Sequence, residues 1–233
     1  MKIALLGYGR MGKEIEAIAI SRLHTITLKA SSSSEKLNLN DVDIAIDFSI
    51  PDAAVSNITQ CIEQGVPVVS GTTGWLDEYD AIVALCNQKK GSFIYASNFS
   101  LGVNLFFELN KQLAKLVQPF PDYKVTIEEI HHTKKLDAPS GTAISLANTI
   151  IEQSKYKDWT LDDPKDTTIP IVAKRIEKVP GTHSIHYDSD IDSIEIKHTA
   201  HNRKGFALGA VIAAEWLIGK TGIFTMKDVL NIS

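Results

Sequence analysis

Residues 1–12, MKIALLGYGRMG, place a short apolar run directly before a G-x-G-x-x-G sequence. The run Lys2–Leu6 predicts a buried strand, and the three glycines predict a tight turn into a helix. Further runs that are apolar on both faces follow at Val42–Phe48, Val66–Ser70 and Ser92–Ala96, with helical patterns between them. Such strands are typical of a parallel sheet covered by helices on both sides. This part is therefore predicted to be a Rossmann-like, doubly wound α/β domain.

One helix of this domain has clear boundary signals. Ser49-Ile50-Pro51 predicts its start, with Ser49 as a cap and Pro51 in the first turn, and Gly65 predicts its end. The four serines at 31–34 are predicted to form a polar loop.

The pattern changes after Asn98. A helix is expected over 104–117 and another over 141–153, and alternating apolar residues predict half-exposed strands at 124–130, 169–176, 183–187 and 192–199. A last helix at 205–218 is expected to pack back on the first domain. We therefore predict a Rossmann-like domain over 1–101 and 206–233, and a C-terminal α+β domain with an open mixed sheet over 102–205. A partner subunit is a plausible cover for the open face of that sheet.

Composition narrows the class of ligand. The 233 residues include 24 Lys and Arg against 28 Asp and Glu, and a net charge of −4 is too mild to attract nucleic acid or an anionic membrane. No apolar run approaches the roughly 18 residues that a membrane span needs. Cys61 and Cys86 lie in amphipathic helical patterns and are predicted to be buried thiols. We expect a cytoplasmic protein with small ligands.

The glycine sequence predicts a dinucleotide site. Gly7 permits the tight turn, Gly9 lets the backbone approach a pyrophosphate, and Gly12 lets the helix pack on the strand. The alternative is a glycine turn without a ligand, but a position between a strand and a helix at the start of an α/β pattern favours the cofactor. The predicted contacts are Gly7, Tyr8, Gly9, Arg10, Met11 and Gly12.

The end of the second strand bears on the choice of cofactor. Dinucleotide sites usually carry an acidic residue there, whereas this chain has Lys29 and the serines from Ser31 onward. A cation with hydroxyl donors suits a 2′-phosphate, which favours NADPH over NADH. A solvated serine loop with a surface lysine is the alternative and leaves either cofactor open.

Two polar stretches follow the ends of later strands. In an open parallel sheet ligands bind at this edge, so both stretches are candidates for contacts with the nicotinamide half of the cofactor. Taken alone, each could be ordinary turn chemistry. The candidate residues are Gly71, Thr72, Thr73, Ala96, Ser97, Asn98 and Phe99.

The densest group of reactive side chains lies between a strand and a helix, in the sequence EIHHTKKLDAPSGTA over 129–143. Ser140, Gly141 and Thr142 at the helix start offer hydroxyl and N–H donors to a carboxylate. A histidine can donate a proton near neutral pH, and a lysine oriented by Asp137 can pair with a second carboxylate or share the protonation step. The alternative is a helix cap at Ser140 followed by a solvated loop.

With Glu128 before it, this stretch resembles the signature of the 4-hydroxy-tetrahydrodipicolinate reductases, E-x-x-H-H followed by K-x-D-x-P-S-G-T-A. Further blocks are similar to the family and occur in its order, so the resemblance covers nearly the whole chain. These blocks are Arg10–Gly12, Asp47–Ser49, Gly71–Gly74, Ser97–Asn104 and His201–Ala207.

The resemblance implies that His131 is the proton donor, that Lys135 is a second catalytic or carboxylate-binding group, and that His132, Gly141 and Thr142 contact the substrate. It also places Gly71–Thr73 and Ala96–Phe99 against the cofactor. In this family NADH or NADPH reduces a cyclic imine dicarboxylate on the route to diaminopimelate and lysine, and the enzyme is typically a homotetramer built through the sheet of the second domain. The missing acidic residue near Ser31 departs from the family and leaves the cofactor preference open.

The sequence also bears on a metal site and on other classes of protein. A metal site is not expected, because His198 and His201 lack metal-ligand spacing. Arg203 and Lys204 could close over a bound dianion or form a surface pair. An amino-acid or semialdehyde dehydrogenase would share the glycine turn but not the histidine and lysine block, and a thioester mechanism would need a cysteine in the second domain. A cofactor-binding sensor would tolerate the loss of His131 and Lys135.

Overall fold

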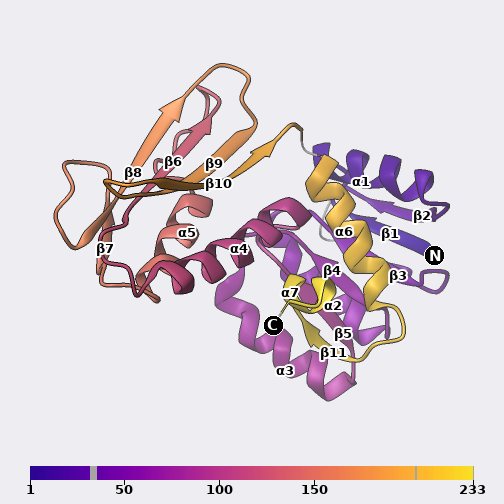
Figure 1. Cartoon of the computed structure of the whole chain (residues 1–233). Helices are drawn as coiled ribbons and strands as arrows, with labels where there is room; N and C mark the ends of the chain where they lie inside the picture. The colour runs from indigo at the N-terminus through magenta and orange to yellow at the C-terminus, as the bar shows by residue number, and fades with distance from the viewer. Residues whose placement is uncertain (32–35, 203, 233) are drawn as a thin grey trace. The chain divides into compact units, whose positions relative to one another are not determined.

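The computed structural model describes residues 1–31, 36–202 and 204–232. The chain forms two compact units, Met1–Asn104 with Lys204–Ser233, and Leu105–Arg203 (Figure 1). Most of the predicted serine loop and the predicted dianion contact Arg203 lie outside the described residues.

Unit 1 is built on a six-stranded parallel sheet with the order β11-β5-β4-β3-β1-β2. The strands are β1 (Lys2–Leu6), β2 (Thr25–Ala30), β3 (Ile44–Asp47), β4 (Val68–Ser70), β5 (Ser92–Tyr95) and β11 (Gly222–Phe224). The helices are α1 (Arg10–Ser21), α2 (Pro51–Glu63), the short 3-10 helix Leu76–Glu78, α3 (Tyr79–Lys89), α6 (Lys204–Leu217) and α7 (Met226–Leu230). The predicted Rossmann-like class is confirmed.

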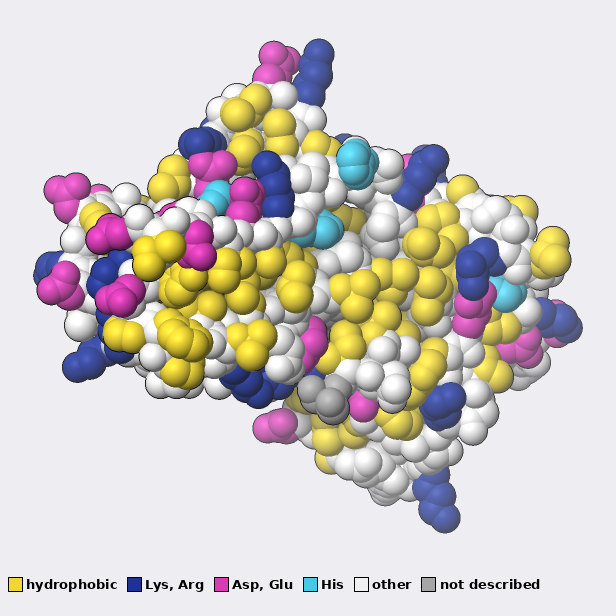
Figure 2. Space-filling model, in the orientation of Figure 1, with side chains coloured by type: hydrophobic (Ala, Val, Ile, Leu, Met, Phe, Trp, Pro, Cys, Tyr) yellow, Lys and Arg dark blue, Asp and Glu magenta, His cyan; other side chains and the backbone are white. Residues whose placement is uncertain are grey.

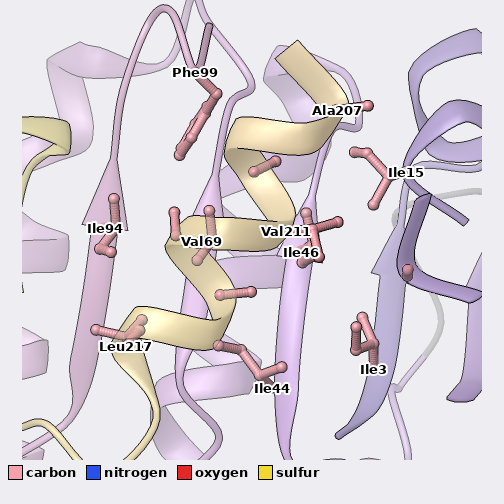
Figure 3. Close-up of a cluster of buried hydrophobic side chains, with 14 of the residues drawn as sticks. Ile3, Ile15, Ile44, Ile46, Val69, Ile94, Phe99, Ala207, Val211 and Leu217 are labelled. Atoms are coloured by element: carbon pink, nitrogen blue, oxygen red, sulfur yellow. The ribbon is translucent and has the colours of Figure 1, made fainter. Parts of the chain in front are cut away.

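Each face of this sheet has its own core. On one face, Ile46, Val69 and Ile94 lie beneath α6, which contributes Val211 and Leu217 (Figure 3). On the other face the strands pack against α2 and α3 through a second cluster that includes Val68, Phe93, Ile58, Ile82 and both cysteines. Burying one such aliphatic or aromatic side chain stabilises the fold by about 1.5–3 kcal/mol. The strands are apolar on both faces because helices cover both, and α6 packs back on unit 1 as predicted.

The start of α2 differs from the prediction. Pro51 is the first helical residue, as expected, but the cap residue is Ile50 and makes no side-chain cap bond. The hydroxyl of Ser49 instead donates to Asp47 Oδ1 at 2.7 Å. Ser49 thus lies one residue before the cap position, and its hydroxyl takes part in the hydrogen bonds around Asp47. Gly65 follows the helix with φ +71°, as predicted for its end.

Unit 2 contains a five-stranded mixed sheet with the order β10-β9-β6-β8-β7. The strands are β6 (Lys124–His131), β7 (Asp158–Thr160), β8 (Thr168–Arg175), β9 (Gly181–Asp188) and β10 (Ser193–Ala200). Helix α5 (Gly141–Ile151) and most of α4 (Leu101–Val117) supply the rest of its core, where Phe106, Val117 and Leu146 pack on Ile127 and Ile185. The predicted α+β organisation with a mixed sheet is confirmed, and the strands β7 and β11 were not among those predicted.

The outer face of the second sheet, opposite the face on which α4 and α5 pack, is more polar than the sequence suggested. Along β6 the buried residues alternate with half-exposed Thr126, Glu128 and Ile130. On β8 the matching positions include exposed Val172 and Lys174, and Lys174 forms an ion pair with Glu128. This face therefore carries scattered apolar residues among charges and hydroxyls.

Charges of both signs are interspersed on the face of the molecule drawn in Figure 2. In the part of the chain that the structure describes, no helix combines the length and apolar character needed to cross a membrane.

Candidate active site

The turn between β1 and α1 has the backbone of a phosphate-binding loop. Gly7 has φ +93°, and a Cβ there would lie 2.2 Å from the carbonyl oxygen of Phe48. A Cβ on Gly12 would lie 2.4 Å from the oxygen of Gly7, whereas a Cβ on Gly9 would meet nothing within 4 Å. The first and third glycines are thus required for packing, and the second leaves open space where a ligand can approach the backbone.

A cavity of about 280 Å³ opens at this turn. It is lined by Gly7, Tyr8, Gly9, Ser31, Phe48, Ser49, Ile50, Ala53 and Asn57. Helix α1 begins beside it with no side-chain cap bond and no acidic residue in its first turn. The first N–H groups of a helix carry partial positive charge, so the residues present fit an anionic pyrophosphate.

Lys29, the candidate 2′-phosphate ligand, already has an acidic neighbour. Its Nζ lies 2.5 Å from Glu16 Oε1 and donates to the hydroxyl of Tyr8 at 3.3 Å. The hydrogen bond to Glu16, followed by the one to Tyr8, raises the pKa of Lys29. Glu16 lies on α1 and not at the end of β2. An acidic residue is therefore present beside Lys29, although the sequence around the strand end contains none.

Asp47 holds together the loops at the carboxyl edge of the sheet. Its buried carboxylate accepts hydrogen bonds from the hydroxyls of Ser49, Ser70 and Thr72 at 2.7–2.9 Å and from Asn57 Nδ2 at 3.1 Å. Burial raises the pKa of Asp47, against the pull of these four donors. The carboxylate therefore joins the ends of β3 and β4 to α2.

The predicted nicotinamide contacts divide into buried and accessible groups. Thr72 is buried, and its hydroxyl is used by Asp47 and by the backbone N–H of Ser49, while Thr73 is exposed. A Cβ on Gly71 would lie 2.3 Å from the ring of Phe48, so only glycine fits there. These contacts leave the backbone of 71–72 and the side chain of Thr73 to meet a ligand.

The stretch after β5 behaves similarly. Phe99 is 1% exposed, its ring lies 5.7 Å from that of Phe48, and its carbonyl is approached closely by Gly209 of α6. Asn98 Oδ1 accepts the N–H of Ser100 at 2.9 Å. Ala96 and Ser97 are half-exposed and exposed. Phe99 is thus a core residue whose side chain packs against Phe48, beneath the loop that follows β5.

In unit 2 the predicted proton donor lies at the end of a strand. His131 is the last residue of β6 and shares a face of the sheet with Glu129, two residues earlier, because side chains alternate along a strand. His183 on β9 pairs with Glu129 in register, and its ring lies 4.9 Å from that of His131 in an edge-on arrangement. Gly181 makes room for His131, since a Cβ there would lie 3.2 Å from His131 Nε2.

The loop 132–140 brings the remaining predicted residues to this strand end. The Nζ of Lys135 donates to both carboxylate oxygens of Asp137 at 2.7 and 2.8 Å, as the sequence suggested. Ser140 caps α5, where its Oγ accepts the N–H of Ala143 at 3.2 Å and lies 3.1 Å from His183 Nε2. The helix therefore leaves the N–H groups of Gly141 and Thr142 directed outward from its first turn.

Burial dominates the electrostatics of the cluster. It lowers the pKa of His183 to about 4 and lowers the pKa of His131, whose pKa Glu129 raises and Lys135 and Arg175 lower. For Glu129, burial acts to raise the pKa, but hydrogen bonds from Ser140 and the charges of His131 and Arg175 hold it below its ordinary value. The ligand-free cluster thus combines neutral imidazoles with an ionised carboxylate.

Glu129, His131 and His183 place one ligand atom each within 4.8 Å of one another, a spacing that could in principle hold a metal ion. The Arg175 guanidinium lies 3.1 Å from Glu129 Oε1, and the N–H of Ser140 occupies Oε2. The positive charge of Arg175, so close to Glu129, opposes the binding of a metal cation at the same carboxylate. The absence of a metal cofactor stays a prediction.

Sequence reasoning assigned no role to Glu16, Asp47, Glu129, Arg175 or His183. For Glu129 a signal existed, because its spacing from His131 puts both side chains on one face of a strand. Arg175 and His183 meet it through strand pairing between segments more than 40 residues apart, which a single sequence does not show.

Two family models cover most of the chain. One described as the N-terminus of dihydrodipicolinate reductase matches residues 19–99, and one described as its C-terminus matches 102–230. The 4-hydroxy-tetrahydrodipicolinate reductase of Christiangramia forsetii is 61% identical over 234 residues, which is 99% of this chain and 98% of the relative. That of Methanococcoides burtonii is 36% identical over 95% of this chain and 86% of the relative.

A solved structure supports the fold alone. The dihydrodipicolinate reductase from Paenisporosarcina sp. TG-14, with dipicolinate bound, matches with a TM-score of 0.82 at 23% identity, over 100% of this chain and 99% of that chain.

The parallel sheet with its glycine turn, joined to an α+β unit, defines a two-domain oxidoreductase that uses NADH or NADPH. The chain belongs to the dihydrodipicolinate reductase family. The predicted family, fold class and NAD(P)H-dependent reductase activity are confirmed, and the dehydrogenase and sensor alternatives fall away.

Proposed function

We propose that this chain reduces the cyclic imine dicarboxylate 4-hydroxy-tetrahydrodipicolinate to tetrahydrodipicolinate, with His131 as the proton donor. The observation that carries the proposal is the convergence of a buried histidine, a lysine and a helix N-terminus around the loop 132–140. A substrate with two carboxylates and a site of protonation needs these three kinds of group.

In this proposal the first turn of α5 binds one carboxylate. The N–H groups of Gly141 and Thr142 donate to it, supported by the helix dipole. Ser140 serves mainly as the cap, because its hydroxyl already accepts the N–H of Ala143. Lys135 and His132 meet the second carboxylate, with Asp137 holding the ammonium group in place until the substrate arrives.

His131 acts as the acid. Burial lowers its pKa in the ligand-free chain, which favours the neutral imidazole. Two carboxylates arriving nearby favour the protonated form, so substrate binding and proton uptake are coupled. In the proposed reaction the 4-hydroxyl group of the substrate leaves as water, which gives an unsaturated ring. One carbon of the new C=C bond receives the hydride, and the imidazole gives its proton to the neighbouring carbon. The imidazole takes another proton from solvent when the product leaves.

The cofactor is proposed to lie along the carboxyl edge of the first sheet. Gly7, Tyr8, Gly9, Arg10, Met11 and Gly12 surround the pyrophosphate, and Lys29 and Ser31 lie near the adenosine ribose. The backbone of Gly71 and Thr72, the side chain of Thr73, and the backbone of Ala96–Phe99 face the nicotinamide ring. When bound, the reduced nicotinamide supplies the hydride. Units 1 and 2 thus act as the dinucleotide-binding domain and as the substrate-binding and oligomerisation domain.

We also propose a cytoplasmic homotetramer assembled through the outer face of the second sheet. Half-exposed Ile130 and exposed Val172 offer apolar contacts there. Light scattering on the purified chain measures the mass. A monomer at micromolar concentration would contradict this assembly.

The test of function follows absorbance loss of NADPH or NADH with enzymatically generated substrate. Wild type should oxidise the cofactor rapidly, whereas His131→Ala and Lys135→Ala should lose activity by about 100-fold or more, the scale of general acid catalysis. Cofactor fluorescence should show unchanged binding in both variants. Bound cofactor without oxidation by wild type would contradict the proposal.

A further inference from the structure

A buried ion pair lies beneath the loop 132–140. The carboxylate of Glu129 is fully buried, with Oε1 accepting from Arg175 Nη1 at 3.1 Å and Oε2 accepting the backbone N–H of Ser140 at 2.9 Å. Burying a carboxylate is costly unless it is paired and hydrogen-bonded. Glu129 meets both conditions, and one of its partners is the last residue of the loop.

Arg175 holds the middle of the same loop. Its Nη2 donates to the carbonyl oxygen of Asp137 at 2.7 Å, and its Nε donates to that of Lys135 at 3.4 Å. A guanidinium presents its donors in a rigid planar fork, so these bonds and the bond to Glu129 restrict the loop in a single geometry. The pair therefore connects β6 and β8 to the middle and to the last residue of the loop that carries Lys135.

Glu129 also faces the ring of the proposed acid. Its Oε2 lies 3.7 Å from His131 Nδ1, which is beyond hydrogen-bond distance but close enough for a strong electrostatic interaction. Nδ1 is buried and has no hydrogen-bond partner among the described residues. The charged and titratable groups that face His131 are Glu129, Lys135, Asp137, Arg175 and His183.

We propose that Glu129 and Arg175 are a positioning pair, which fixes the loop 132–140 for carboxylate binding and sets the balance of charge at His131. The pair acts through His131, Lys135 and the start of α5. The inference rests on the roles proposed above for those residues.

The proposal predicts opposite electrostatic effects from its two members. Glu129→Gln removes a negative charge, which lowers the pKa of His131, while Arg175→Met removes a positive charge, which raises it. Both changes release the loop, and both should weaken dicarboxylate binding, by about tenfold for the loss of charged hydrogen bonds. The opposite pKa shifts test the effect of the pair on the charge at His131, and the loss of dicarboxylate affinity in both variants tests its effect on the loop.

The sheet provides a matched control. Glu128 and Lys174 each lie one residue before a member of the pair, on the same two strands. Their side chains point to the opposite face of the sheet and form an ion pair of the same type. Glu128→Gln and Lys174→Met therefore repeat each charge change away from His131.

The experiment titrates His131 by NMR with labelled histidine and measures the affinity for dipicolinate by calorimetry, in the full chain without turnover. Glu129→Gln should lower the pKa of His131 and Arg175→Met should raise it, with the control variants near wild type. Because Arg175→Met leaves a buried carboxylate unpaired and could impair folding, the double variant Glu129→Gln/Arg175→Met is included. Its His131 pKa should return toward wild type while dipicolinate affinity stays reduced.

Shifts of the same sign, or shifts no larger than those of the controls, would overturn the positioning pair. Wild-type affinity for dipicolinate in the double variant would do the same. Failure of the proposed function is separable, because it appears as a wild-type chain that does not oxidise NADPH or NADH with substrate whatever the NMR titration shows.

Discussion

His131 and Gly181 face each other across the β6–β9 pair, and the absence of a side chain at 181 gives the imidazole its place. The backbone of Gly181 is extended, so alanine is allowed by conformation. Its Cβ would nevertheless lie 3.2 Å from Nε2 and 3.3 Å from Cδ2 of His131. The constraint is steric and acts on one ring.

Gly181→Ala should lower kcat by about tenfold, because small displacements of a catalytic group are costly, with a smaller effect on KM. Thermal unfolding should change little. Ser184→Ala, on the same strand with its side chain on the opposite face, is the control in steady-state assays. Equal kcat values for Gly181→Ala and wild type would show that the ring adjusts without loss.

We expect the cofactor preference to depend on the ion pair formed by Lys29 and Glu16. Glu16→Gln removes the carboxylate and leaves Lys29 free to meet a 2′-phosphate, so the affinity ratio of NADPH to NADH should rise several-fold at low salt. Lys29→Met should bring the ratio down. Fluorescence titration with each cofactor measures both dissociation constants, and Glu14→Gln on the same helix is the control. A ratio that does not respond to either change would remove Lys29 from the cofactor site.

At the scale of elements, Asp47 joins β3, β4 and α2 through four hydrogen bonds to one carboxylate. Local sequence explains each element but not this junction. The ends of β3 and β4 are adjacent because the strands are parallel, and Asn57 reaches the carboxylate from the second turn of the helix. The junction sets the shape of the two loops that we assign to the cofactor.

Asp47→Asn should lower the free energy of unfolding by about 2–4 kcal/mol, since an amide N–H₂ would face groups that now donate to the carboxylate. NADPH binding should weaken in parallel. Urea unfolding and cofactor titration measure the two effects, with exposed Asp163→Asn as the control. A fully stable variant with normal cofactor affinity would contradict this role for the carboxylate.

At the scale of the whole molecule, the buried histidine cluster links folding to pH. The pKa of His183 is about 4 in the folded chain, against an ordinary value of 6.5. Between these values the unfolded chain binds a proton that the folded chain does not. The free energy of unfolding is therefore not reduced by this group above about pH 6.5. It declines as the pH falls toward 4, by up to about 1.4 kcal/mol per pH unit for His183.

His183→Gln removes this titration, so the stability advantage of wild type over the variant should shrink steadily from pH 7 to pH 4.5. Urea unfolding at several pH values measures the difference. His186→Gln is the matched control, because His186 is half-exposed on the other face of the same strand. A wild-type advantage that stays constant over this range would contradict the assignment.

The sequence by itself determined the family, the doubly wound domain, the return of the last helix to it and the stretch 129–143 that contains His131 and Lys135. These features depend on local signals, namely apolar periodicity, glycine spacing and a dense run of reactive residues, which need no knowledge of distant contacts. The same local rules misassigned Ser49 as a helix cap, since the cap position of α2 is Ile50 and the Ser49 hydroxyl instead donates to the buried carboxylate of Asp47.

Only the tertiary structure decided how these parts are held. Glu16 contacts Lys29 from a neighbouring helix, the missing side chain of Gly181 leaves space for His131, and Arg175 connects Glu129 to the loop. In each case the residues are too far apart in the sequence for a local pattern to predict the contact. The physical reason is that strand pairing and burial bring these groups together, and both are settled by the packing of the whole sheet. The loop can be read from residues 129–143 alone, whereas the groups that position it lie on other strands.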